Sequence, residues 1–326
     1  MTWATTSYYE QSLNRAKDSQ DSSRISFELA TAEDFSQVID QLADAKLVYS
    51  PLVLKLYGLL HRDLMLKAGK YVLRRDLTSS QILEILSGQT ILEKWLTIPE
   101  GWRLTQIAER IEANNLGAKE DFLLRTKNAS ILSPTILERF PFLKEIPADQ
   151  GLEGYLFPDS YILPPDPQPT DIIVRALQNL AQKLEPEVNQ ALQERGISLH
   201  SVLTLASIIE KEATEERDKQ MIADILWRRL ANGVALGADP TVLYALGSWD
   251  LPLTSKNLQI DSPYNTRRFA GLPPGPIGTS SLSSIMAAVR PKENDYWYFL
   301  AESDSGKIHY ARTLEEHKQN KARYLR

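Results

Sequence analysis

Cysteine is absent from the 326 residues, which excludes disulfide bonds and thiolate chemistry. Histidine is scarce, and His61, His200, His309 and His317 show no metal-ligand spacing, so we expect neither a metal ion nor a cofactor. An excess of basic charge is also missing, because 37 basic and 42 acidic residues give a net charge of -5 without long blocks of one sign. This balance excludes a surface that follows a phosphate backbone, and nucleic acid is therefore not an expected partner.

Long hydrophobic runs are lacking as well. No segment approaches the roughly 18 to 20 consecutive apolar residues that a membrane-spanning helix needs. Residues 1–23 are polar and lack the apolar core of a signal peptide, so we expect a flexible lead-in there. On this evidence the chain is expected to be soluble as it stands, and membrane attachment would require an N-terminal anchor that it does not contain.

Hydrophobic periodicity is what the chain does contain, and it indicates two domains. Residues 24–90 read as a small strand-helix-helix-strand module, with strands at 24–30 and 64–75 and helices at about 31–45 and 50–62. Residues 91–326 read as a larger, mainly helical α+β domain that ends in a hairpin of 296–301 with 307–312 and a last helix capped by Thr313. The expected class is therefore α+β, and the small module, which shows no acid, base or nucleophile constellation, is interpreted as a binding element.

Glu210 is the candidate catalytic residue. Ser198 can cap a helix whose apolar residues recur every three or four positions from Leu199 to Ala213, and Glu210 falls on the edge of that stripe. A carboxylate against an apolar wall should resist ionisation, as a general acid requires. Stripe-edge glutamates more often reach solvent or pair with a base, and the helical wheel turns Glu212 away from the stripe as a solvated residue.

Two further segments carry candidate binding residues. In 153–161, Tyr155 and Tyr161 lie beside Glu153, and aromatic rings next to carboxylates are typical of sugar sites, although a structural aromatic corner is equally compatible. In 237–247, Asp239 precedes a proline and reads first as a helix N-cap and only second as a chemical group. A single long helix is expected over 171–195.

The stretch 260–281 is the least helical part of the larger domain. It contains four prolines and three glycines, and long ordered loops of this composition are usually kept for a binding edge.

Five segments together resemble one family, the endolytic murein transglycosylases of the MltG or YceG-like type. The order and spacing agree over roughly residues 24–325, and the set is specific although each segment alone is weak. The segments are LASIIEKEA (205–213), ADPTVLYALG (238–247), SPYNTRRFAGLPPGPIGTSS (262–281), EGYLFPDSY (153–161) and YWYFLAESDSGKIHYARTLEEH (296–317).

The resemblance implies an enzyme that cuts nascent peptidoglycan glycan strands between N-acetylmuramic acid and N-acetylglucosamine, leaving 1,6-anhydromuramyl ends. The first Glu of the family's E-K-E segment, here Glu210, is the implied catalytic residue, acting as acid and then as base. Residues 24–90 would correspond to a LysM-like region and residues 91–326 to the catalytic domain. The implied location is the outer face of the bacterial cytoplasmic membrane, near penicillin-binding proteins.

Supporting roles follow from the same segments. Tyr264, Asn265 and Thr266 are expected to hydrogen-bond the sugar or its N-acetyl group. Glu153, Tyr155, Tyr161 and Asp239 are the other candidate substrate-binding residues.

Two alternatives stay open on the sequence. One is a hydrolytic muramidase, in which Asp239 or Glu153 serves as a second carboxylate beside Glu210. The other is a non-catalytic scaffold that binds peptidoglycan through the small module and uses Glu210 structurally.

Overall fold

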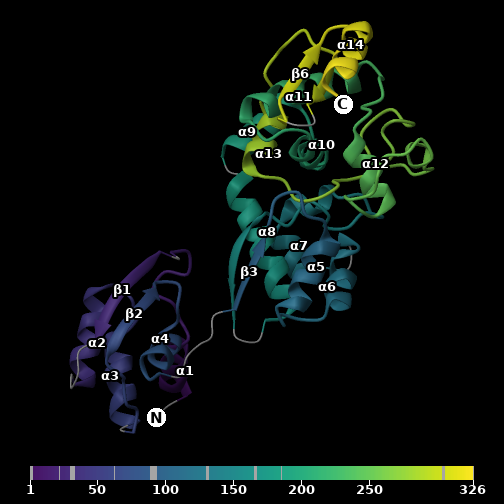
Figure 1. Ribbon diagram of the computed structural model, residues 1–326. Coiled ribbons are helices and arrows are strands. Elements are labelled where there is room, and N and C mark those ends of the chain that lie inside the picture. Colours follow the sequence, from purple (N-terminus) through teal and green to yellow (C-terminus); the bar gives the residue numbers. More distant parts are fainter. Residues whose placement is uncertain are drawn as a thin grey trace. The chain divides into compact units, whose positions relative to one another are not determined.

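The computed structural model describes residues 3–21, 23–29, 34–61, 63–88, 94–129, 132–164, 167–184, 186–302 and 305–325 (Figure 1). The chain forms two compact units, Met1–Glu93 and Lys94–Arg326. The domain boundary expected after residue 90 lies outside the described residues. No helix in the described ranges is long and apolar enough to cross a membrane.

The first unit is built on one antiparallel strand pair. Strands β1 (Arg24–Leu29) and β2 (Gly69–Arg74) place Phe27 opposite Tyr71, with helices α2 (Phe35–Asp44) and α3 (Pro51–Leu60) between them in sequence and α4 (Ser79–Leu86) after them. Leucine, isoleucine and valine side chains from all these elements form a separate hydrophobic core. The order strand, helix, helix, strand is as predicted, but β2 is shorter than the predicted strand over 64–75.

The expectation of a flexible lead-in over 1–23 is wrong for much of that segment. Helix α1 covers Trp3–Leu13, and Leu13 is buried in the core of the first unit. Ala16 then forms a β-bridge with Thr78. The segment packs because Leu13 contributes an apolar side chain to the core, which the polar composition of residues 1–23 did not indicate.

One half of the second unit surrounds a second strand pair. Strands β3 (Lys94–Ile98) and β4 (Asp159–Leu163) are antiparallel, with Leu96 opposite Tyr161. The helices of this half are α5 (Leu104–Ala113), α6 (Lys119–Thr126), α7 (Pro134–Arg139), the 3-10 helix η2 (Pro141–Glu145) and α8 (Pro169–Leu184). Helix α9 (Glu187–Arg195) follows α8 and also packs against the segment 282–289 of the other half. The single helix predicted over 171–195 is therefore wrong. Pro186 lies at the break, where its ring and missing N–H prevent a continuous helix.

The other half is organised around α10 (Leu199–Glu212). Its remaining elements are α11 (Glu216–Ala231), α12 (Asp239–Leu246), η3 (Asn257–Gln259), α13 (Leu282–Val289), β5 (Tyr298–Ala301), β6 (Ile308–Ala311) and α14 (Leu314–Tyr324). Strands β5 and β6 form the predicted hairpin, and Thr313 caps α14 as predicted. The class is α+β, as the sequence indicates.

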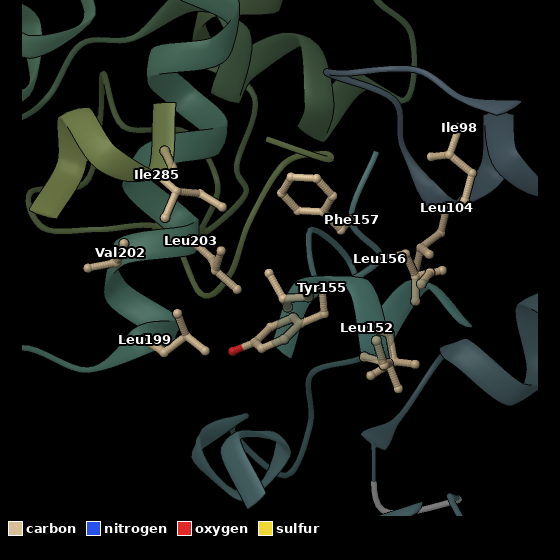
Figure 2. Close-up of a cluster of buried hydrophobic side chains, with 14 of the residues drawn as sticks. Ile98, Leu104, Leu152, Tyr155, Leu156, Phe157, Leu199, Val202, Leu203 and Ile285 are labelled. Atoms are coloured by element: carbon tan, nitrogen blue, oxygen red, sulfur yellow. The ribbon is translucent and has the colours of Figure 1, made fainter. Parts of the chain in front are cut away.

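Helix α10 is buried far more completely than one apolar stripe predicts. Every residue from Val202 to Ile209 is buried, including Thr204 and Ser207, because α11, α12 and α13 all pack against it. Figure 2 shows Leu199 and Leu203 of α10 on the side of the helix toward Tyr155, and Val202 on its other side. A helix enclosed in this way holds its C-terminal side chains in fixed positions.

Candidate active site

Glu210 lies in the last turn of α10, and one of its two oxygens is firmly anchored. Oε2 accepts hydrogen bonds from the Ser281 backbone N–H (2.9 Å), the Ser281 hydroxyl (2.5 Å) and the Ser284 hydroxyl (2.6 Å). Ser281 is also the N-cap of α13, where its hydroxyl accepts from the Ser284 N–H. The helix N-terminus therefore holds the carboxylate, in the manner typical of anions at such positions.

Lys219 of α11 completes the surroundings of this carboxylate. Its Nζ lies 3.4 Å from both Glu210 oxygens and donates to the hydroxyls of Ser281 (3.1 Å) and Ser283 (3.0 Å). The side chains of Lys219 and Glu210 are only 5% and 9% exposed, so this is a buried ion pair. Among the described residues, Oε1 has only the long Lys219 contact, which leaves this oxygen available to a ligand.

The ionisation of Glu210 differs from the sequence expectation. Burial raises its pKa, but hydrogen bonds from the Ser281 hydroxyl, the Ser284 hydroxyl and the Ser281 N–H, together with the Lys219 charge, outweigh burial and lower the pKa below its ordinary value. The prediction of a carboxyl kept neutral by an apolar wall is wrong, because the wall is apolar only along α10 itself. The surroundings of Glu210 in the free protein thus favour its carboxylate form.

A second carboxylate, Glu100, faces the same region and was not anticipated from the sequence. It sits in the turn after β3, which is joined to Thr279 by four hydrogen bonds: the Gly101 N–H to the Thr279 carbonyl, the Trp102 N–H to the Thr279 hydroxyl, that hydroxyl to the Pro99 carbonyl, and the Thr279 N–H to the Trp102 carbonyl. Burial, followed by the negative charge of Glu210, raises the pKa of Glu100. The turn thus fixes an acid beside the segment that anchors Glu210.

Glu153 supports the start of α5. Its two oxygens accept from the Leu104 N–H at 3.1 and 3.3 Å, and Oε2 also accepts from the Tyr244 hydroxyl at 3.3 Å. Burial raises the pKa of Glu153 to about 7, against the lowering effects of these hydrogen bonds and of Arg103. Tyr264 packs its ring against Tyr244 and donates to Gln150, so this candidate residue joins the Glu153 cluster.

Four other candidate binding residues are buried structural groups. Tyr155 is fully buried with its hydroxyl 3.0 Å from His200 Nδ1, and Tyr161 is buried with its hydroxyl donating to the Phe157 carbonyl. Asn265 is fully buried and donates to two loop carbonyls, while the buried Thr266 accepts from the Ala238 N–H. These positions argue against the predicted direct contacts with a sugar, since the hydrogen-bonding groups are already used within the fold.

The prediction that Asp239 caps its helix is wrong. Ala238 is the N-cap of α12, and Asp239 is the first helical residue, where it forms an ion pair with Arg267 (Arg267 Nε to Asp239 Oδ1, 2.6 Å). Asp239 and Arg267 line a cavity of about 300 Å³.

Glu212 lines the same cavity and is half-buried rather than solvated as predicted. The helical wheel of α10 could not show that the α12 segment and the C-terminal hairpin pack over this side of the helix. Burial, and then the charge of Asp239, raise the pKa of Glu212 to about 7, while Arg267 lowers it.

Comparison with known protein families shows which family the chain belongs to. The model of the YceG-like family matches residues 27–323. The chain belongs to the YceG-like family. It is 37% identical over 268 residues to the endolytic murein transglycosylase of Bacillus subtilis, covering 79% of this chain and 73% of that relative.

Other YceG-like relatives agree. The endolytic murein transglycosylase of Streptococcus pneumoniae serotype 2 is 30% identical over 306 residues, which cover 87% of this chain but 55% of that protein. A crystal structure of a YceG-like protein from Listeria monocytogenes matches with a TM-score of 0.63 and 36% identity, over 91% of this chain and 99% of that chain.

In the described part of this YceG-like chain, no group of three or more His, Asp or Glu side chains is placed to hold a metal ion. The site that emerges is Glu210 with Ser281, Ser284, Lys219 and Glu100. The sequence carried one signal for its partners, since Ser281 precedes an apolar helical stretch as an N-cap does. Nothing local in the sequence pointed to Lys219 or Glu100.

Proposed function

We propose that this YceG-like protein is an endo-acting lytic transglycosylase, which cleaves the bond between N-acetylmuramic acid and N-acetylglucosamine in nascent glycan strands and leaves 1,6-anhydromuramyl ends. The observation that carries this proposal is the asymmetry of Glu210, whose Oε2 is held by three donors while Oε1 is open. The names and identities of the relatives support the substrate class.

Glu210 acts through Oε1 in the proposed mechanism. Desolvation by the bound glycan adds to the burial that already raises the pKa of Glu210, so Oε1 takes up a proton while Oε2 keeps its three hydrogen bonds. Oε1–H then gives this proton to the glycosidic oxygen as the C1–O bond breaks. The regenerated carboxylate accepts the proton of the sugar's own C6 hydroxyl as O6 closes on C1, so Glu210 is again protonated and returns to the carboxylate when product leaves.

The charged neighbours of Glu210 have distinct parts in this scheme. Lys219 favours the carboxylate and thereby favours release of the proton, whereas Glu100, lying near Glu210, opposes the ionised form and stabilises a positively charged sugar. One carboxylate at the reacting bond is sufficient because the C6 hydroxyl replaces the attacking water. Asp239, in its ion pair with Arg267, and Glu153, at the N-terminus of α5, are both engaged in other structural contacts.

The first unit has a separate role in the proposal. We infer that it contacts glycan in the manner of a LysM-like module, on the support of its strand-helix-helix-strand order and its β1–β2 pair. The enzyme would then work on the outer face of the bacterial cytoplasmic membrane, beside the penicillin-binding proteins that make its substrate.

The decisive experiment is digestion of uncrosslinked glycan strands followed by mass spectrometry of the new ends. Anhydro ends are expected with the wild-type protein, and Glu210→Gln should lower the rate by about 10²- to 10⁴-fold while leaving the fold intact. Glu194→Gln, an exposed acid on α9, is the matched control and should be fully active. Ends heavier by one water would indicate a hydrolase instead, and unchanged cleavage by Glu210→Gln would refute the assignment of Glu210.

A further inference from the structure

The cavity beside Glu212 differs from the Glu210 site because its charged side chains are incompletely paired. Glu212 has neither an ion pair nor a hydrogen bond within the described residues, although it is half-buried. The two charges that act on Glu212, Asp239 and Arg267, are paired with each other, and Arg267 forms no ion pair with Glu212 in the described ranges. A half-buried carboxylate without a partner is unfavourable, and a ligand cation would remove that cost.

Unpaired positive charge lines the same cavity. Arg229 uses Nε and Nη1 to donate to the carbonyls of Trp297 and Leu236, but it has no carboxylate partner among the described residues. Lys321 of α14 likewise lines the cavity without an ion pair in the described ranges. The cavity therefore offers one unpaired carboxylate and two unpaired cations. These groups complement the ammonium and the carboxylate of a zwitterion.

The size and the lining of the cavity further restrict the class of ligand that it can bind. Its volume of about 300 Å³ lies at the lower end of small-molecule sites, which suits a side chain or a chain terminus better than a sugar ring pair. Phe299 and Leu236 supply apolar wall, so a short aliphatic stem can lie between the charged groups. A neutral sugar would leave Glu212, Arg229 and Lys321 unsatisfied.

We propose that this cavity, the Glu212 pocket, binds a peptide group that carries both an ammonium and a carboxylate, with the ammonium at Glu212 and the carboxylate at Arg229 and Lys321. The diamino-acid side chains of peptidoglycan stem peptides have this chemistry, and that identity of the ligand rests on the proposed function. Glu212 and Glu210 both lie in the last turn of α10, but their side chains point to different sides of the helix, so a stem peptide held at Glu212 would reach the catalytic carboxylate around the helix end.

Calorimetric titration of the full chain with three tripeptides, each acetylated at its N-terminus and amidated at its C-terminal α-carboxyl group, tests the pocket. The first has meso-diaminopimelate at its third position, the second has the side-chain ammonium acetylated, and the third has lysine there and lacks the side-chain carboxylate. Only the first should bind well. Glu212→Gln should weaken its binding by about 10- to 100-fold, as expected for one lost charge-assisted contact, and should remove the preference over the acetylated peptide.

Two controls keep the test selective. Glu315→Gln changes an exposed acid of α14 outside the pocket and should bind like the wild type, and thermal unfolding of each variant monitors the fold. Lys321→Met should reduce the preference for diaminopimelate over lysine. Equal binding of all three peptides, or an unaffected Glu212→Gln, would overturn the proposal.

A final comparison distinguishes free peptide from peptide attached to a glycan strand as the ligand. It also distinguishes failure of the Glu212 pocket from failure of the proposed transglycosylase activity. The same diaminopimelate tripeptide attached to its disaccharide should bind at least as tightly as the free peptide, and binding of the free peptide alone would overturn the assignment to strands. Cleavage of glycan without any peptide binding refutes the Glu212 pocket alone. Peptide binding without cleavage refutes the transglycosylase proposal alone.

Discussion

Replacing Ser284 by alanine isolates one donor of the Glu210 anchor. The Ser284 hydroxyl is fully buried and donates to Glu210 Oε2 at 2.6 Å. A hydrogen bond to a charged group contributes about 1.5 to 3 kcal/mol, and one pKa unit corresponds to about 1.4 kcal/mol. Ser284→Ala should therefore raise the pKa of Glu210 by about 1 to 2 units and destabilise the protein by about 1.5 to 3 kcal/mol at neutral pH.

The pH dependence of Ser284→Ala gives the sign of the effect. The pKa of Glu210 is lowered in the folded protein, so the anchor stabilises the fold above the ordinary carboxyl pKa of 4.5 and this stabilisation is lost as pH falls through the folded value. The stability difference between wild type and Ser284→Ala should shrink as the pH falls below 4.5. In the activity profile, the higher pKa should move the alkaline limb to higher pH.

Urea unfolding over a range of pH measures the first effect, and carbon NMR of the Glu210 carboxyl measures the pKa directly. Ser283→Ala is the matched control, because Ser283 lies on the same helix and donates no bond to Glu210, contacting Lys219 and Ser281 instead. A stability loss that is independent of pH, or a Glu210 pKa that does not rise, would refute the account of the anchor.

Two further predictions concern the other carboxyl groups. Glu100→Gln removes a negative charge near Glu210, so the pKa of Glu210 should fall. The alkaline limb of the activity profile should then move to lower pH, opposite to its movement in Ser284→Ala. A shift in the same direction as Ser284→Ala would contradict the coupling between Glu100 and Glu210. Because the pKa of Glu153 is raised to about 7, the folded state binds this proton more tightly than the unfolded state, and stability should fall between about pH 4.5 and 7 by up to about 3 kcal/mol. Glu153→Gln keeps an acceptor for the Leu104 N–H and should flatten that part of the denaturation profile; an unchanged slope would count against the buried, protonated Glu153.

The elements of the second unit were largely predictable, because caps and apolar periods are local properties. Ser198 begins α10 and Thr313 begins α14 where the sequence places them. The break at Pro186 could have been predicted from the proline itself, but apolar residues recur at helical spacing on both sides of it and favoured a single helix.

The environment of Glu210 was not predictable, because it depends on contacts between distant segments. Ser281 and Ser284 lie more than 70 residues further along the chain, and only the packing of α13 on α10 directs their hydroxyls at Oε2. The same packing reversed the expected direction of the Glu210 pKa. A helical wheel likewise places Glu212 relative to its own helix but cannot show what covers it, and aromatic residues such as Tyr155 look alike in a core and in a groove.

The assembly of the Glu210 site from three distant segments has a consequence during synthesis. The α10–α11 pair and the stretch from Thr279 to Ser284 must both be present before Oε2 acquires its donors, and the turn at 99–102 is hydrogen-bonded to Thr279 of that stretch. A chain still emerging from the ribosome, or one cut short ahead of α13, carries Glu210 without its anchor. The carboxylate of Glu210 would thus become fixed in orientation only after the chain has been made through Ser284.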